Sequence, residues 1–501
     1  MATDSASLEI HVLNVGQGDS VLVINRDLDK AKAAITAAKG AGGVPAQPAD
    51  YVPYAVANDV PLAGTVKKAL LMDGGDDEYG GDVLNYMAAH GVVQGTSGYC
   101  PNLLLAVSHY HDDHMAGLRS VFKKQVTITT KVDGKDVTSV TLEDRFRPAV
   151  FYGSVTNKAT NPTSQRFAAF MEDVLGASMA TADPTKVVYV FPGGLDGPGG
   201  KTVTISLGTG VDNIPITGYF LASAQGVWDA GKGAVVTIPA KGSVTDQNDR
   251  SLVLMLEYGS FRCLLGGDIA GDGGTAGGNF GVNQAPGGKA FFSQHADVES
   301  TLGPALEAFF PETTTWTAGQ PKYLVPGYAT VLKANHHASS SSVDVHLLAT
   351  VQPVIFACSS GVKARFHSHP TQAVMNRVDV AETPRWGRRA RYSYPADFLE
   401  VPNSIGGTYI TEVAAKYNNK AFDVDIHEAQ IIGDVVIRPF DETVSAVQNA
   451  TAPGEELTIQ VYGIGVLTGL SDPGNVLRDV TLGYTPGSVY PLGPVLHNDK
   501  H

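Results

Sequence analysis

The stretch "SHYHDDHMAGL", residues 108–118, places three histidines and two aspartates between positions 109 and 114. It follows the apolar run "NLLLAV" (102–107), which is typical of a buried strand, and it leads into apolar residues at helical spacing. At the end of an extended strand, residues two apart point the same way, so His109 and His111 can face one ion. The turn that follows lets Asp113 and His114 approach a second ion. Imidazole and carboxylate are ligands of zinc, so this spacing predicts a metal site.

The composition is that of a globular protein with a substantial core. The chain has 501 residues, of which 43% are hydrophobic. That length suits one large domain with insertions or two to three ordinary domains. Lys and Arg number 36 against 50 Asp and Glu, for a formal net charge of −14. This charge argues against a nonspecific nucleic-acid coat, because it repels a phosphate backbone.

The ends and the cysteines of the chain bear on its compartment. The N-terminal "MATDSASLEI" lacks the basic start and apolar run of a secretory signal, and no run of about 18 uncharged apolar residues occurs. We therefore expect a cytoplasmic protein with no membrane segment. Cys100, Cys263 and Cys358 are widely spaced, which argues against a disulfide framework or a zinc-thiolate site. We expect them to be buried as small hydrophobic residues.

Strand and helix signals alternate along the chain. Residues 8–24, "LEIHVLNVGQGDSVLVI", predict a hairpin whose turn is "GQGDS". Strands are predicted at 67–75, 102–109, 329–337 and 354–360, and a second hairpin over 251–269. Helices are predicted over 82–91, 164–176, 296–310 and 343–351, and a helix start at Met115 in "MAGLRSVFKK" (115–124). At the tip of the first hairpin, two interpretations stay open for three residues: a plain turn, or part of a site. These are Gln17, Gly18 and Asp19.

The order "HYHDDH" (109–114) resembles the His-X-His-X-Asp-His motif of the metallo-β-lactamase superfamily. "LLMDGG", with Asp73, is similar to the motif whose acidic residue braces the histidine loop, although Asp-Gly is also common turn chemistry. "LLGGDI", with Asp268, resembles the later motif whose aspartate bridges two metals. The resemblance implies an αββα sandwich, an α/β fold that is α+β by sheet type, with the metal site at one sheet edge.

Within that superfamily, several blocks resemble the soluble metallohydrolase domain of ComEC-like bacterial DNA-uptake proteins. These blocks are "HVLNVGQGDSVLVI" (11–24), "NDRSLVLMLEYGSFRCLLGGD" (248–268), "LKANHHASSSS" (332–342) and "HSHP" (367–370). The sequence departs from that pattern at Asn14, where Asp is common, and at Ala338, where Gly follows the histidine pair. The channel's membrane spans are absent from this sequence, so the resemblance does not imply DNA import.

The resemblance also implies a domain organisation. Residues 1–400 would form the metallo-β-lactamase-like hydrolase domain, with insertions near 26–66 and 270–328. The second insertion is Gly-rich and is typical of a surface loop or flap. Residues 401–501 are punctuated by Pro and Gly between strand-like runs, and we expect a β-rich extension that partly completes the sandwich.

A long stretch of the sequence without histidine limits the expected ligand set. No histidine occurs from Met115 to Gln294, where most two-metal members of the superfamily supply a third imidazole. One position would then hold His109, His111 and Asp268, completed by water or Asn248, so we expect unequal metal affinities. The full expected ligand set is His109, His111, Asp113, His114, Asp268, His336 and His337.

Two histidine pairs further along the chain carry open alternatives. His336 and His337 are adjacent, so their side chains diverge and we expect one ligand, with His337 favoured; alternatively, both cap a strand end. His367 and His369 can share a face beside Arg365, which suits metal binding, leaving-group protonation or phosphate recognition. A plain loop pair is the alternative. Residues expected near the substrate or behind the ligands are Asp73, Asn248, Ser251, Ser339, Arg365 and His367.

The predicted chemistry is metal-assisted hydrolysis. Two divalent ions, zinc first with manganese or iron as alternatives, would lower the pKa of a shared water. Asp113 and Asp268 would orient that water, and His369 would act in catalysis. We expect a phosphodiesterase of nuclease type, acting on a small-molecule or nucleic-acid phosphodiester, with no obligate protein partner. The alternatives are a carboxyl-ester or lactone hydrolase on the same site, and a noncatalytic binding protein stapled by a metal. The remaining histidines, among them His295, are expected in the core or on the surface.

Overall fold

The computed structural model describes most of the chain. The described residues are 5–93, 98–132, 135–154, 185–190, 203–224, 226–238, 247–271, 284–285, 289–290, 295–322, 325–361, 369–378, 385–389, 398–402, 404–411, 416–417, 420–421, 430–452, 454–464, 476–483 and 492–497. The helix predicted over 164–176 and most of the Gly-rich stretch after residue 271 lie outside them. None of the helices in the described part is long and apolar enough to cross a membrane.

The first large sheet has ten strands and is antiparallel on one side and parallel on the other. Strands β1 and β2 pair antiparallel, as the "GQGDS" turn predicts, and β3, β4, β7 and β8 run parallel to one another. In order across the sheet the strands are β28 (Leu492–His497), β27 (Val476–Gly483), β26 (Glu456–Ile464), β25 (Asp434–Pro439), β1 (Leu8–Val12), β2 (Val21–Arg26), β3 (Val66–Met72), β4 (Gly98–Val107), β7 (Phe146–Ser154) and β8 (Lys186–Val190).

The second large sheet also has ten strands. Its centre is the hairpin β13–β14, which agrees with the hairpin predicted over 251–269. In order the strands are β12 (Ala234–Thr237), β11 (Gly226–Asp229), β10 (Pro215–Ser223), β13 (Val253–Tyr258), β14 (Phe261–Leu265), β17 (Val331–Lys333), β18 (Ile355–Cys358), β21 (Gly407–Ile410) and β24 (Gln430–Ile431), with β9 (Thr204–Thr209) also paired to β10.

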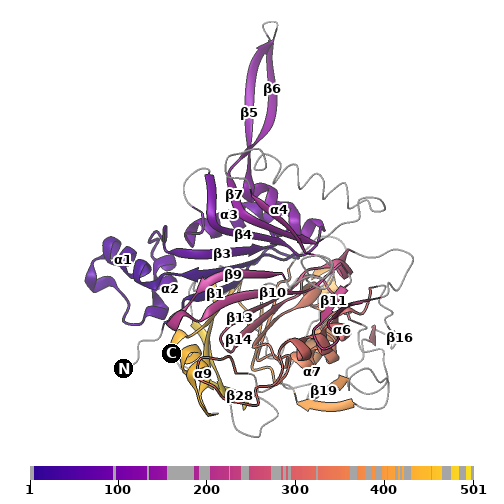
Figure 1. Cartoon of the computed structure of the whole chain (residues 1–501). Coiled ribbons are helices and arrows are strands. Elements are labelled where there is room, and N and C mark those ends of the chain that lie inside the picture. Colours follow the sequence, from indigo (N-terminus) through magenta and orange to yellow (C-terminus); the bar gives the residue numbers. More distant parts are fainter. Residues whose placement is uncertain are drawn as a thin grey trace.

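The two sheets pack face to face, and the strand period of two places alternate residues on opposite faces. Ile10 and Val23 of the first sheet lie in the same buried cluster as Leu254 and Val331 of the second. The other faces are covered by helices (Figure 1). α3 (Gly80–Ala89) and α4 (Asp112–Phe122) cover the first sheet, and α6 (Val298–Phe309), α7 (Val345–Val351) and α8 (Gln372–Val378) cover the second. Helices and sheets thus form four layers, a mixed α and β architecture as expected.

Segments outside these layers are placed as follows. Residues 26–66 carry α1 (Leu28–Lys39) and α2 (Tyr51–Ala57), which share a small core of their own. Strands β5 (Lys123–Val132) and β6 (Lys135–Asp144) form a hairpin that projects from the body (Figure 1). In the C-terminal part, β25 joins the first sheet beside β1, and helix α9 (Asp441–Asn449) interrupts the strands. The division into a 1–400 domain and a 401–501 extension stays a prediction.

Two differences from the predicted elements affect the site. Helix α4 begins at Asp112, earlier than the helix expected from Met115 onward, with Asp112 and Asp113 in its first turn. Carboxylates are stabilised there by the helix dipole, which favours the earlier start. The strand predicted over 329–337 ends at Lys333, because His336, His337 and Ala338 all have positive φ angles of 48°, 52° and 63°.

Candidate metal centre

The residues expected to bind metal converge at one edge of the two sheets. His109 follows β4, and Asp268 follows β14, while the His336–His337 turn follows β17. Because β3 and β4 are parallel, as are β14 and β17, their carboxyl ends meet at the same edge. Residues far apart in the sequence are thereby placed side by side, which is the condition for a shared ion site.

Asp268 is the centre of the cluster. Its Oδ1 lies 3.2 Å from Nε2 of His114 and 3.5 Å from Nε2 of His337. Its Oδ2 lies 3.8 Å from Nε2 of both His109 and His336. Burial favours the neutral acid, yet the imidazoles of His114, His337 and His336 hold the pKa of Asp268 well below its ordinary value. The carboxylate is therefore the ionised, metal-binding form.

His114 is oriented by Asp73. Asp73 follows β3 with a positive φ of 64°, and its Oδ2 lies 3.0 Å from Nδ1 of His114. Nδ1 therefore keeps a hydrogen, and Nε2 is the atom that faces Asp268 and that a metal would bind in place of its own proton. Burial disfavours the cation, but Asp268 and Asp73 together hold the pKa of His114 well above its ordinary value. Asp73 lies where the brace interpretation places it.

His109 is held by two serines. Its Nδ1 lies 3.2 Å from Oγ of Ser108 and 3.3 Å from Oγ of Ser251. Because Ser108 donates its own hydrogen to Asp73, its Oγ is available to accept from His109. Ser251 also accepts from the main-chain N–H of Asp268, at 3.1 Å. Burial, with His114 nearby, lowers the pKa of His109 well below its ordinary value, so the ring is neutral and able to bind a cation.

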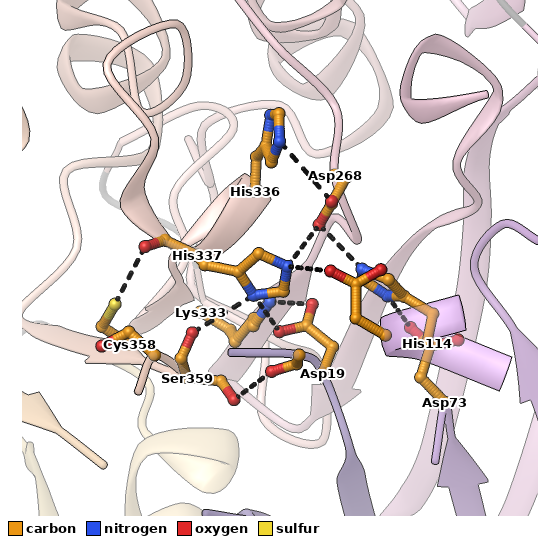
Figure 2. A network of polar contacts seen from close by, with 12 residues as sticks. Asp19, Asp73, His114, Asp268, Lys333, His336, His337, Cys358 and Ser359 are labelled. Atoms are coloured by element: carbon orange, nitrogen blue, oxygen red, sulfur yellow. Dashed lines mark hydrogen bonds and ion pairs between the residues drawn. The ribbon is translucent and has the colours of Figure 1, made fainter. Parts of the chain in front are cut away.

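His337 lies between two aspartates. Its Nε2 faces Asp268 and lies 3.9 Å from Oδ2 of Asp113. Its Nδ1 lies 3.2 Å from Oδ1 of Asp19 and 3.3 Å from the main-chain oxygen of Ser359 (Figure 2). With acceptors on the Nδ1 side, a hydrogen stays there, and Nε2 is the atom that faces the cluster and that a metal would bind in place of its own proton. Burial lowers the pKa of His337, but the aspartates more than offset this and raise it to about 9.

These atoms fit a metal ion. Nε2 of His114, Nε2 of His337 and Oδ1 of Asp268 are buried and make no hydrogen bond within the described part of the chain. Ligands of a tetrahedral zinc at its usual bond lengths stand roughly 3.3 Å apart, near the separations around Asp268. Four groups of potential ligands overlap among the described residues: His109, His114 and Asp268; Asp113, His114 and His337; Asp19, Asp268 and His337; and Asp19, Asp73 and His114.

His111 is outside the groups of potential ligands found among the described residues, and its role as a ligand stays a prediction. We expected His109, His111 and Asp268 at one position, but His114 completes that group. His111 is the residue before α4 and is partly exposed, whereas His114 lies buried in the first turn. Nδ1 of His111 lies 3.0 Å from Nε2 of His109, which is the same nitrogen that faces Oδ2 of Asp268 at 3.8 Å.

The remaining predicted residues lie beside the cluster, and we call His336, Asn248 and His369 its rim. Nδ2 of Asn248 lies 3.3 Å from Nε2 of His336, and the ring of His369 lies 5.9 Å from that of His336. Burial lowers the pKa of His336 to about 4, so this ring is neutral. Ser339 follows the turn and its Oγ lies 3.4 Å from Oγ of Ser341. Arg365 and His367 lie outside the described residues.

Three residues near the cluster, His295, Asp249 and Lys333, were not predicted to belong to it, and Asp19 was left open. His295, expected in the core or on the surface, lies with its Nδ1 3.6 Å from Asp249 and its ring 5.3 Å from that of His336. Asp19, left open as a turn residue, contacts His337 and forms an ion pair with Lys333. The "GQGD" turn beside a strand was the available signal for Asp19. No local pattern marks His295, because its partners are brought together only by the fold.

The chain was compared with known proteins. No family model matches it, and no curated protein matches it. Among solved structures, it is similar to Zn²⁺-bound PqqB from Methylobacterium extorquens, with 10% sequence identity and a TM-score of 0.25. The alignment covers 61% of this chain and 81% of PqqB. At this TM-score and identity, nothing about this chain is inferred from the likeness.

Proposed function

We propose that this protein is a metal-dependent hydrolase of the metallo-β-lactamase superfamily. The observation that carries the proposal is the convergence of buried imidazoles on the ionised Asp268, which Nε2 of His114 and Nε2 of His337 both face. The motif order in the sequence and the four layers of helix and sheet support the family.

Two zinc ions, with manganese or iron as alternatives, would be held here, one by His109, His114 and Asp268 and the other by Asp113 and His337, because Nε2 of His114 can bind only one ion. Zinc bound there would lower the pKa of a water molecule to about 7, and so supply a nucleophile at neutral pH. Asp268 and Asp113 would orient that water and accept its hydrogens. On the rim, the neutral ring of His336 and the amide of Asn248 would position the substrate, and His369 would deliver a proton to the leaving group.

We propose a phosphodiester as the substrate, either a small molecule or a nucleic-acid strand. The blocks that resemble ComEC-like domains support this choice, and the net charge of −14 favours a small or short substrate over duplex DNA. A cytoplasmic location and the lack of an obligate protein partner belong to the same proposal. A carboxyl-ester or lactone substrate is the second candidate, because the neutral His336 gives the rim no positive charge for a phosphate.

Hydrolysis of a bis-aryl phosphate, an aryl ester, a lactone and single-stranded DNA, with and without a chelator, tests the function. We expect turnover of the bis-aryl phosphate that is lost on chelation and restored by zinc. The Asp268→Asn variant should bind zinc weakly and turn over none of the substrates. Full activity of Asp268→Asn would overturn the proposal, and turnover of esters alone would select the second candidate. Zinc binding without turnover of any substrate would favour a metal-stapled binding protein.

A further inference from the structure

A buried ion pair lies directly behind one side of the metal centre. Lys333 is the last residue of β17, and its Nζ contacts Oδ2 of Asp19 in the turn between β1 and β2. Both side chains are almost fully buried, at 1% and 3% exposure. The other oxygen of Asp19 lies 3.2 Å from Nδ1 of His337 (Figure 2). One oxygen of Asp19 therefore contacts a lysine, and the other contacts a candidate metal ligand.

The opposite side of the centre lacks such a lysine among the contacts that the structure describes. Asp73 stands behind His114 as Asp19 stands behind His337. Its further donors are the main-chain N–H and the hydroxyl of Ser108, at 2.7 and 2.6 Å. Both donors are neutral. The carboxylates behind His337 and His114 thus differ in one partner, the ammonium group of Lys333, which contacts Asp19.

One unit of charge has a large effect at a buried dication. A carboxylate behind a ligating imidazole makes the ring a better donor and attracts the metal, and outer residues of this kind change metal affinity by roughly 10–100-fold. An ammonium at the same place repels the dication and draws the carboxylate's charge away from the ring. Burial strengthens both effects, because water does not screen them.

We propose that Lys333 and Asp19 set the affinity of the metal position at His337 with opposite sign, Lys333 lowering it and Asp19 raising it. This position is thereby the weaker and more exchangeable of the two. Lys333 acts through Asp19 and His337 as a positioning residue. The inference rests on the proposed metal centre, and it adds a reason for unequal occupancy that the ligands alone do not provide.

Zinc titration of chelator-treated protein, read by competition with a chromophoric chelator, tests the inference without any substrate. Lys333→Met should tighten the weaker dissociation constant by about 10-fold, and Asp19→Asn should weaken it by roughly 10–100-fold. The tighter constant should change less than the weaker one in both variants, because Asp19 contacts His337 and lies only within 4.8 Å of the ligand atom of His114. Lys333→Arg, which keeps the charge, should behave as the wild type. A merely structural ion pair predicts instead that Lys333→Met and Asp19→Asn both weaken zinc binding.

A second comparison covers the case in which Asp19→Asn does not fold, since it leaves a buried ammonium without its partner. The double variant Asp19→Asn/Lys333→Met carries no charge at the pair, and it should bind the second zinc more weakly than Lys333→Met alone. One zinc in the wild type and two in Lys333→Met would also support the inference.

Three results would overturn the inference. They are weakening by both single substitutions, equal constants in Lys333→Met and the double variant, and one zinc in both the wild type and Lys333→Met. A wild type that binds no zinc at all would overturn the proposed function instead.

Discussion

The carboxylate of Glu299 on α6 lies 2.7 Å from Nδ2 of Asn335, the residue that precedes the His336–His337 pair. The same carboxylate accepts hydrogen bonds from the main-chain N–H groups of Val343 and Asp344, at 2.8 and 2.7 Å. One buried side chain thus ties both ends of the loop after β17 to a helix. We infer that this tie holds the two histidines in their left-handed conformation, which L-residues adopt only at an energetic cost.

Asn335→Ala should therefore weaken the tie between Glu299 and the loop that carries His336 and His337. It removes one of the three donors to a buried carboxylate, so we expect the free energy of unfolding to fall by about 1–3 kcal/mol. Zinc affinity at the His337 position should fall as well. Chemical denaturation and zinc titration measure the two effects. The matched control is Asn449→Ala on the exposed side of α9, which should change neither quantity.

The two adjacent histidines should respond differently to substitution. Nε2 of His337 lies 3.5 Å from Asp268 and belongs to two of the candidate ligand groups, whereas His336 lies further away and is absent from them. We expect His337→Ala to lose one zinc, and His336→Ala to keep both zinc ions with reduced turnover. Metal content by elemental analysis separates the two variants. Loss of zinc only in His336→Ala would reverse the assignment.

Much of this arrangement could be predicted from local sequence. The "HYHDDH" order and the apolar run before it place three imidazoles at a strand end, and "LLMDGG" predicts a carboxylate near them. Asp73 and His114 are indeed within 3.0 Å. Both hairpins were also predictable, because period-two apolar runs flank short turns. These features depend on neighbours in the sequence.

The rest of the site depends on contacts between distant segments. The Lys333–Asp19 pair joins residues 314 positions apart, and no local pattern marks either as charged and buried. His114, which is grouped with His109 and Asp268, lies in the first turn of α4, and helix ends are poorly defined by periodicity. The positive φ angles at His336 and His337 contradict a predicted strand, because the fold overrides local propensity there.

Substitution of Asp73 tests whether its carboxylate orients His114 for metal binding. Asp73→Ala removes the acceptor that keeps the hydrogen on Nδ1 of His114, so the ring can turn or change tautomer. We expect the zinc affinity of the His109 and His114 position to fall by roughly 10–100-fold. Titration of the apo variant with zinc measures this change. Unchanged affinity would show that Asp73 serves only as a turn residue.

Zinc should stabilise the fold measurably. The centre joins turns from both sheets, and a ligand that binds only the folded state adds about 2.7 kcal/mol when present at 100 times its dissociation constant. We expect thermal unfolding at a higher temperature with zinc than with a chelator, and no such difference in Asp268→Asn. Differential scanning fluorimetry at several zinc concentrations checks this. An equal shift in Asp268→Asn would indicate zinc binding elsewhere.

Asp434, at the start of β25, should make stability depend on pH. Burial, assisted by Asp82, raises the pKa of Asp434 from 3.8 to about 7, although the N–H of Asn14 donates to it at 2.6 Å. The folded protein therefore holds this proton to a higher pH than the unfolded chain does. Stability from the protonated form is fully present below about pH 4 and is lost as the pH rises through 7.

Asp434→Asn keeps an acceptor for Asn14 but has no proton to lose. Its free energy of unfolding, relative to wild type, should rise between pH 4 and pH 7 by on the order of 1 kcal/mol, since the side chain is partly exposed and water screens its charge. Urea denaturation of both proteins across this range measures the difference. A difference that stays constant with pH would mean that Asp434 is ionised in the folded protein throughout the range.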